Sequence, residues 1–221
     1  MTMSKPICID LFCGLGGFSE GFLAEGYFCV GFDIVRHDYG TGGYPGQLVL
    51  QDVLTIHGSQ FKDAACIVAS PPCQAYSYRA MPWTRAKALP PPSNELFDAC
   101  FRIQREACAA AGRHIPLIVE NVRGAQKWVG RAAWHFGPWF LWGDVPAIMP
   151  LCYKPKQGGD WFNAERPSIA RLTGSKSKAR LKAVAMISKI PFDLSSYIAK
   201  CYYPMEDRAQ PQEDARGQAQ P

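Results

Sequence analysis

The chain begins with a strand, a glycine-rich turn, a helix and a second strand, all within its first 33 residues. Residues 7–12 are a short apolar run, typical of a buried parallel strand. The turn is Cys-Gly-Leu-Gly-Gly at residues 13–17, and residues 18–25 predict a helix that Gly26 ends. Residues 27–32 predict the second strand, which Asp33 follows. This order is that of a nucleotide-binding βαβ unit.

The same alternation continues along the chain. Residues 65–69 and 116–119 predict two more buried strands, and residues 95–111 predict a helix between them. Residues 79–94 contain four prolines and predict a long loop. Residues 129–150 predict short strands and turns, and residues 180–187 and 191–201 predict two final helices. We therefore expect an α/β fold, a doubly wound and mostly parallel sheet covered on both faces.

The length of 221 residues, 48% of them apolar, is enough for one full hydrophobic core. We expect a single domain over residues 5–203 and a disordered, largely polar tail over residues 204–221. No apolar run is long enough to cross a bilayer, and residues 1–9 lack the layout of a secretory signal. These features predict a cytoplasmic protein, and we expect a monomer.

The chain has nine cysteines but no Cys-x-x-Cys pair and no Cys/His cluster. A secreted disulfide framework and a structural zinc site are therefore both unexpected, and we predict no metal. The net charge is only +5, but basic residues gather in one stretch: Arg166, Arg171, Lys176, Lys178, Arg180, Lys182 and Lys189. This stretch fits either a solvated face or a surface that contacts phosphates.

Candidate binding residues lie where the predicted strands end, because ligands of doubly wound sheets bind beyond the carboxyl ends of the strands. Gly14, Gly16 and Gly17 allow a ligand to approach the backbone closely, beside the first amides of a helix. Asp33 is placed to accept hydrogen bonds from ribose hydroxyls. A glycine turn can also be purely structural, but Asp10 before it and Asp33 after it favour a binding site.

Two further strands end on reactive side chains. Pro71 and Pro72 fix the backbone beyond residues 65–69 and place Cys73 at the same edge of the sheet as the glycine turn, where a thiol can act as a nucleophile. Glu120 ends the strand at residues 116–119. Partial desolvation there would raise the pKa of its carboxyl and suit it to donate a proton.

Three segments in this order resemble motifs of the cytosine-C5 DNA methyltransferases. They are Asp-Leu-Phe-Cys-Gly-Leu-Gly-Gly at residues 10–17, Pro-Pro-Cys-Gln-x-x-Ser at residues 71–77 and Glu-Asn-Val at residues 120–122. With Asp33 and Asp52, the resemblance covers residues 7–123.

The resemblance implies S-adenosylmethionine as methyl donor, lying over the glycine turn. Phe12 would pack against its adenine, Asp33 would hold its ribose and Asp52 would lie near its adenine amino group. Cys73 would attack C6 of a cytosine while Glu120 contacts N3 and the exocyclic amine. The cytosine would have to be flipped out of the helix, and methyl transfer to C5 and loss of the C5 proton would then release Cys73.

The resemblance also implies a DNA substrate, duplex DNA in the first place. The loop at residues 75–94, with Arg79, Arg85 and Lys87, would be a lid over the DNA. The expected DNA-contacting residues are Gln74, Ser77, Arg79, Arg85, Asn121, Arg171, Lys176 and Lys178.

The chain departs from the family's pattern after residue 122. The family's Gln-x-Arg-x-Arg motif is replaced by aromatic residues at 136–142, and Arg123 and Arg131 are the remaining candidates for its role. Residues 187–191 resemble the family's Gly-Asn-x-Val-Pro motif, with Ser188 in the asparagine position and therefore near the cofactor. Residues 154–182 leave room for only a reduced target-recognition region. We therefore expect short or relaxed sequence specificity, as in phage and prophage enzymes.

Three alternatives remain open. The chain could be a catalytically silent relative that binds DNA or cofactor, although it keeps both Cys73 and Glu120. It could be an NAD-dependent oxidoreductase, but residues 14–17 do not fit Gly-x-Gly-x-x-Gly. Its substrate could also be RNA or single-stranded DNA.

Overall fold

The computed structural model describes residues 4–77, 84, 88, 90–150 and 178–204. Seven strands form one sheet in the order β3-β2-β1-β4-β5-β7-β6. Five strands are parallel: β1 (Ile7–Leu11), β2 (Phe28–Asp33), β3 (Gln47–Leu50), β4 (Ala64–Ala69) and β5 (Leu117–Asn121). The hairpin of β6 (Trp134–Phe136) and β7 (Trp139–Gly143) adds to β5 in the antiparallel sense. The predicted mostly parallel, doubly wound sheet is thus confirmed.

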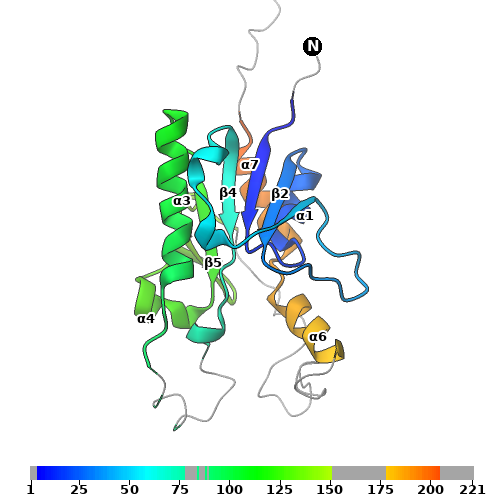
Figure 1. Cartoon of the computed structure of the whole chain (residues 1–221), viewed down its shortest axis with the longest axis vertical. Helices are drawn as coiled ribbons and strands as arrows, with labels where there is room; N and C mark the ends of the chain where they lie inside the picture. Colours follow the sequence, from blue (N-terminus) through cyan, green and yellow to red (C-terminus); the bar gives the residue numbers. More distant parts are fainter. Residues whose placement is uncertain (1–3, 78–83, 85–87, 89, 151–177, 205–221) are drawn as a thin grey trace, which may run out of the picture.

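Helices cover both faces of this sheet (Figure 1). The long helix α3 (Glu95–Ala111) lies on one face, and α1 (Gly17–Ala24) and α7 (Phe192–Tyr202) lie on the other. The shorter helices α4 (Gln126–Val129) and α6 (Lys178–Ser188) lie toward the lower edge of Figure 1, to which the strand arrows of β2 and β4 point. These helices agree with the sequence-based ranges except for α4, which was not predicted.

The two faces carry separate hydrophobic cores. Leu11 and Ile67 pack with Ile103 of α3, whereas Phe22 of α1 and Leu194 of α7 pack on the opposite face. All five side chains are fully buried. Because both faces of the strands are covered, their sequences are nearly continuous apolar runs rather than alternating ones.

Helices α1 and α7 cross at very close range. A Cβ added to Gly21 would lie 2.2 Å from Ser195 Oγ and 2.3 Å from the Ser196 nitrogen. The hydroxyl of Tyr27 also donates a hydrogen bond to the Ala199 carbonyl at 3.0 Å. The last described helix is therefore an integral part of the core that surrounds the first strand and helix.

The connection from β2 to β3 contains no helix, although crossovers between parallel strands usually do. Residues 34–46 run instead as an irregular segment in which Tyr44 packs against β2. A Cβ added to Gly31 of β2 would lie 2.4 Å from Cζ of Tyr44. Glycine at position 31 therefore makes room for the tyrosine ring where a crossover helix would normally pack.

Several sequence-based expectations concern residues outside the described ranges. They include most of the loop at 79–94, the stretch at 151–177 that holds most of the expected target-recognition region, and the tail at 205–221. In the described part of the chain, no helix combines the length and apolarity that a membrane span requires.

Candidate functional site

The glycine turn follows β1 and has an unusual backbone. Phe12 has a φ of 57°, the single positive value among the described non-glycine residues, and Gly14 and Gly16 have φ values of 50° and 75°. The Gly16 amide donates to the Cys13 carbonyl at 2.7 Å and closes the turn. A positive φ at a bulky residue is strained, and such strain concentrates at ligand sites.

Asp33, at the carboxyl end of β2, is tied to this turn. Its Oδ2 accepts a hydrogen bond from the Gly14 amide at 3.0 Å, and its Oδ1 accepts from the Val35 amide at 3.2 Å. His37 Nε2 lies 3.6 Å from the same Oδ1. The structure thus brings Gly14 and Asp33 together as predicted, and no heavy atom lies within 4 Å of where a Gly14 Cβ would be.

Asp10 lies beneath the turn, inside the protein. It is 2% exposed, and its Oδ2 accepts a hydrogen bond from Ser19 Oγ at 2.6 Å. Ser19 Oγ lies 2.6 Å from the Tyr44 hydroxyl, which donates to it because the serine proton is directed to Asp10. Burial raises the pKa of the Asp10 carboxyl to about 8. Asp10 therefore supports the turn from within the core.

The segment after α6 packs directly on the glycine turn. A Cβ added to Gly17 would lie 2.6 Å from the Ile190 nitrogen and 3.1 Å from Lys189 Cγ. Lys189 also forms an ion pair with Glu20 in the first turn of α1. Ser188, the exposed last residue of α6, is thereby brought near the turn, as its resemblance to the family's last motif predicts.

Asp52 follows β3 and is exposed. Its Oδ1 accepts a hydrogen bond from the Leu54 amide at 2.9 Å and caps the short helix η1 (Val53–Thr55). Capping leaves the second carboxylate oxygen of Asp52 with no hydrogen bond from the described residues.

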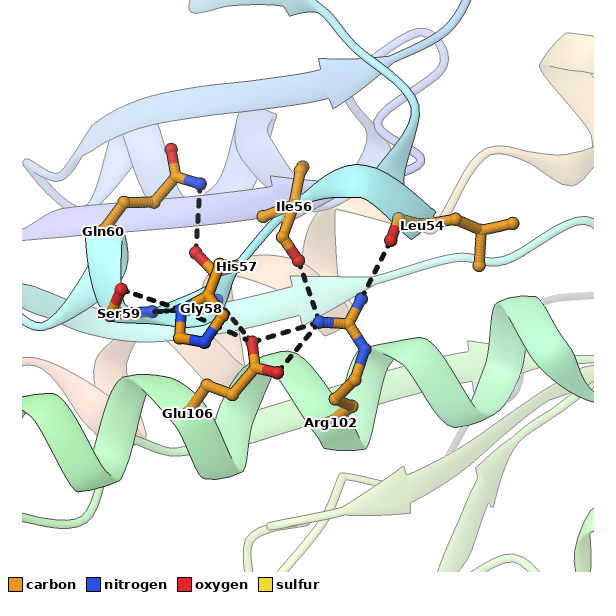
Figure 2. A network of polar contacts seen from close by, with 8 residues as sticks. All are labelled: Leu54, Ile56, His57, Gly58, Ser59, Gln60, Arg102 and Glu106. Atoms are coloured by element: carbon orange, nitrogen blue, oxygen red, sulfur yellow. Dashed lines mark hydrogen bonds and ion pairs between the residues drawn. The ribbon is translucent and has the colours of Figure 1, made fainter.

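Two side chains of α3 hold the segment that begins at Asp52 (Figure 2). The Arg102 guanidinium donates to the carbonyls of Ile56 at 2.9 Å and Leu54 at 3.3 Å. It also pairs with Glu106 at 3.0 Å, and Glu106 Oε2 accepts from the Gly58 amide at 2.6 Å. Partial burial alone would raise the pKa of the Glu106 carboxyl, but the Gly58 amide and Arg102 outweigh it and hold that pKa below its usual value.

Cys73 lies just beyond β4, at the start of the short helix η3 (Gln74–Tyr76), and is partly exposed. Gln74 is exposed and Ser77 is partly exposed. Glu120 is the fourth residue of the neighbouring strand β5 and is also partly exposed. Because β4 and β5 are parallel neighbours, both residues lie at the same edge of the sheet, as predicted.

Asn121 joins the two segments that carry Cys73 and Glu120. It is 1% exposed, and its Nδ2 donates to the Pro71 carbonyl at 2.9 Å. Its Oδ1 accepts from the Val122 amide at 2.8 Å. Both ends of the amide are therefore used inside the protein, where it fixes the path of the chain two residues before Cys73.

Asn94 makes a second link to the segment of Cys73. It precedes α3, yet its side chain makes no capping hydrogen bond to that helix. Its Oδ1 accepts from the Tyr76 hydroxyl at 3.0 Å, and its Nδ2 donates to the Trp128 carbonyl at 3.0 Å. The helix after Cys73 is thus connected through one amide to α4, which follows the Glu-Asn-Val segment.

The structure does not describe every expected DNA contact. Arg79, Arg85, Arg171 and Lys176 lie outside the described residues, and of Lys178 only the backbone, at the start of α6, is described. Tyr44, Asn94, Arg102 and Glu106 were not singled out from the sequence. Their contacts join residues 18 to 48 positions apart in the chain, and no local pattern reports such contacts. Among the described residues, no cluster of three or more potential ligands could hold a metal ion.

The fold and the site together define a Rossmann-like α/β protein whose glycine turn, ribose-type acid, cysteine and glutamate share one edge of the sheet. Residues 7–128 match the family model described as C-5 cytosine-specific DNA methylase. The matched range holds every one of those elements, and the chain belongs to this family.

Individual relatives match the same part of the chain. The Type II methyltransferase M.AplI of Arthrospira platensis is 31% identical over 129 residues, which are 55% of this chain and 32% of the relative. A putative DNA modification methyltransferase encoded within a prophage of E. coli has a TM-score of 0.41 at 24% identity, over 57% of this chain and 34% of that one. For the Dnmt2 methyltransferase of S. pombe the TM-score is 0.38 at 16% identity, over 56% and 36%. The chain thus spans about a third of the length of these proteins.

Proposed function

We propose that this protein methylates C5 of cytosine in DNA, with S-adenosylmethionine as the methyl donor. The observation that carries the proposal is the placement of Cys73 and Glu120 at the ends of adjacent parallel strands, joined by the hydrogen bond from Asn121 to Pro71. One residue supplies a nucleophile that can leave again, and the other supplies a proton to the ring.

In the proposed reaction, the Cys73 thiolate forms a bond to C6 of the cytosine while Glu120 donates a proton to N3. Protonation lets the ring accept the electron pair, so C5 becomes nucleophilic and takes the methyl group. Loss of the C5 proton then returns the electrons that break the bond between C6 and sulfur. Because a stacked base cannot present C6 to a thiol, the cytosine must be extruded from the helix.

The residues at the glycine turn fit the methyl donor. The backbone at Gly14 is open to a ligand, Asp33 is held at the end of β2, and Asp52 keeps one carboxylate oxygen that the described residues leave unused. When bound, S-adenosylmethionine would supply an electrophilic methyl group. Phe12, Gly16, Gly17 and Ser188 are the further residues that we assign to its binding. Asp10 and Asn121 are buried, and we assign them positioning roles rather than ligand contacts.

The DNA-contacting roles of Gln74, Ser77, Arg79, Arg85, Arg171, Lys176 and Lys178 remain part of the proposal, as do the lid at residues 75–94 and the reduced target-recognition region. Short or relaxed sequence specificity follows from that reduced region. Bisulfite or nanopore mapping of DNA from expressing cells tests it, and a long, strict recognition site would contradict it.

Covalent trapping on DNA that contains 5-fluorocytosine tests the reaction itself, because fluorine at C5 cannot leave as a proton does. With S-adenosylmethionine present, the wild type should form a stable protein–DNA adduct, and Cys73→Ala should form none. Glu120→Gln should trap far more slowly, because it cannot protonate N3. Absence of any adduct with the wild type, on duplex DNA, single-stranded DNA and RNA alike, would exclude this mechanism.

The same assay separates the remaining alternatives. A silent relative would bind DNA or cofactor without trapping, and an RNA-directed enzyme would trap only on RNA. A nicotinamide-dependent oxidoreductase would bind NAD in a direct titration and would leave all three nucleic acids unmodified.

A further inference from the structure

A surface rich in cations follows Glu120 directly in the chain. Residues 121–143 contain no aspartate or glutamate, but they contain Arg123, Lys127 and Arg131. All three side chains are exposed, and none pairs with an acidic residue in the described part of the chain. Arg123 and Lys127 lie four residues apart in consecutive helical turns and therefore share a face.

Aromatic rings stack beside these cations. The His135 ring lies 5.0 Å from the Phe140 ring at an interplanar angle of 17°, and the Trp134 ring lies 6.5 Å from His135 at 25°. Trp134 is 38% exposed and forms the outer end of this stack, on β6 at the edge of the described sheet. A stack with an exposed ring at its end can receive one more flat ring.

The stack and the cations lie on the same side of the proposed active site. Asn121 pairs with Phe140, and Phe140 pairs with His135, so the three residues share one face of the sheet. Phe140 packs against the core that α3 and Trp128 also contact. The link through Asn94 connects Trp128 to the helix that follows Cys73. The surface is therefore continuous with the edge of the sheet at which Cys73 lies, with α4 at the lower left of Figure 1.

We infer that Arg123, Lys127, Arg131 and Trp134 form a binding surface for an unpaired segment of the nucleic-acid substrate. The three cations contact phosphates, and one base stacks on Trp134. This inference deepens the proposed function and rests on it for the identity of the substrate. Extruding a base leaves its neighbours without a stacking partner, and a sequence-tolerant combination of cations and rings suits such a segment.

Binding measured without methyl transfer tests this surface. Fluorescence anisotropy of the full chain with a labelled single-stranded DNA, and with the same strand in a duplex, gives Kd over a series of salt concentrations. Lys127→Gln with Arg131→Gln should weaken binding and reduce the slope of log Kd against log salt by roughly 1.4, which corresponds to two lost contacts to single-strand phosphates. Lys5→Gln with Lys62→Gln removes two exposed cations at the opposite edge of the sheet and should behave as the wild type.

The stacking part has its own variants. Trp134→Ala should weaken single-strand binding roughly fivefold or more without changing the salt slope, whereas Phe28→Ala, which removes an exposed ring at the amino end of β2, should leave binding unchanged. A DNA in which 2-aminopurine replaces one base should show quenching with the wild type and less with Trp134→Ala.

Surface variants that bind as tightly as their controls would overturn the inference, even if the wild type forms trapped adducts. Loss of binding in the surface variants would support it, even if the wild type traps no DNA. A wild type that binds neither single-stranded nor duplex DNA would overturn both proposals.

Discussion

Asn121 donates a hydrogen bond to the Pro71 carbonyl at 2.9 Å, across 50 residues of sequence. The carbonyl belongs to the segment that carries Cys73, and Asn121 directly follows Glu120. A buried amide thus fixes the two reactive side chains relative to each other, because it joins the backbones on which they stand.

Replacement of Asn121 by alanine should therefore affect chemistry more than cofactor binding. The Pro71 carbonyl would be left buried without its partner, at a cost of about 1–3 kcal/mol in the free energy of unfolding. We expect Asn121→Ala to slow adduct formation on 5-fluorocytosine DNA at least about tenfold, with an unchanged Kd for S-adenosylmethionine. Ile198→Val, a mild core truncation in α7, controls for lost stability. Equal trapping rates in the two variants would show that Asn121 only stabilises the fold.

The glycine turn offers a matched pair of substitutions. In Gly17→Ala the new methyl group meets the Ile190 backbone nitrogen at 2.6 Å, so the segment before α7 must move. In Gly14→Ala the new methyl group meets no atom within 4 Å, and the cost comes only from a φ of 50°, about 1 kcal/mol. Hydrogen exchange should show lost amide protection in α7 for Gly17→Ala but not for Gly14→Ala. The same protection of α7 in both variants would contradict the packing described here.

The buried carboxyl of Asp10 predicts that stability depends on pH. Its pKa of about 8 in the folded protein lies above its ordinary value of 3.8, so this group stabilises the fold fully below about pH 4. That contribution is lost as the pH rises toward 8, by up to roughly 1.4 kcal/mol per pH unit. Urea denaturation should therefore show that Asp10→Asn gains stability relative to the wild type between about pH 5 and pH 8. A pH-independent difference between the two proteins would mean that Asp10 is ionised when buried.

Glu106 should show the opposite dependence. Its pKa in the folded protein is held below its ordinary value of 4.5, so its contribution is present above about pH 4.5 and is lost as the pH falls through the lowered pKa. At pH 7 Glu106→Gln should lose at most about 1 kcal/mol, since the side chain is partly exposed. Below about pH 3 it should equal the wild type. Asp63→Asn, at an exposed carboxyl outside this network, is the control. If Glu106→Gln loses no more stability at pH 7 than this control, the network in Figure 2 contributes nothing measurable.

Local patterns predicted most of the sheet, because strands covered on both faces are continuous apolar runs that end at glycine, proline or acidic residues. They missed β3, whose four residues lie half-exposed next to a glycine-rich segment. They placed Cys73 and Glu120 at one edge correctly, since parallel strands share an edge. They could not show that Asn121 and Asp10 are buried, or that Asn94 bridges two helices instead of capping one, because those facts depend on residues distant in sequence.

The contact between Gly17 and Ile190 has a consequence for synthesis of the chain on the ribosome. At about 5 to 20 residues per second, roughly 10 to 40 seconds pass between translation of the glycine turn and translation of the segment that packs on it. During this interval Phe18 and Phe22, which α7 later helps to cover, have no native partner from the end of the chain. The nascent protein therefore carries an apolar helix in need of chaperone protection, and its first motif reaches its final packing among the last.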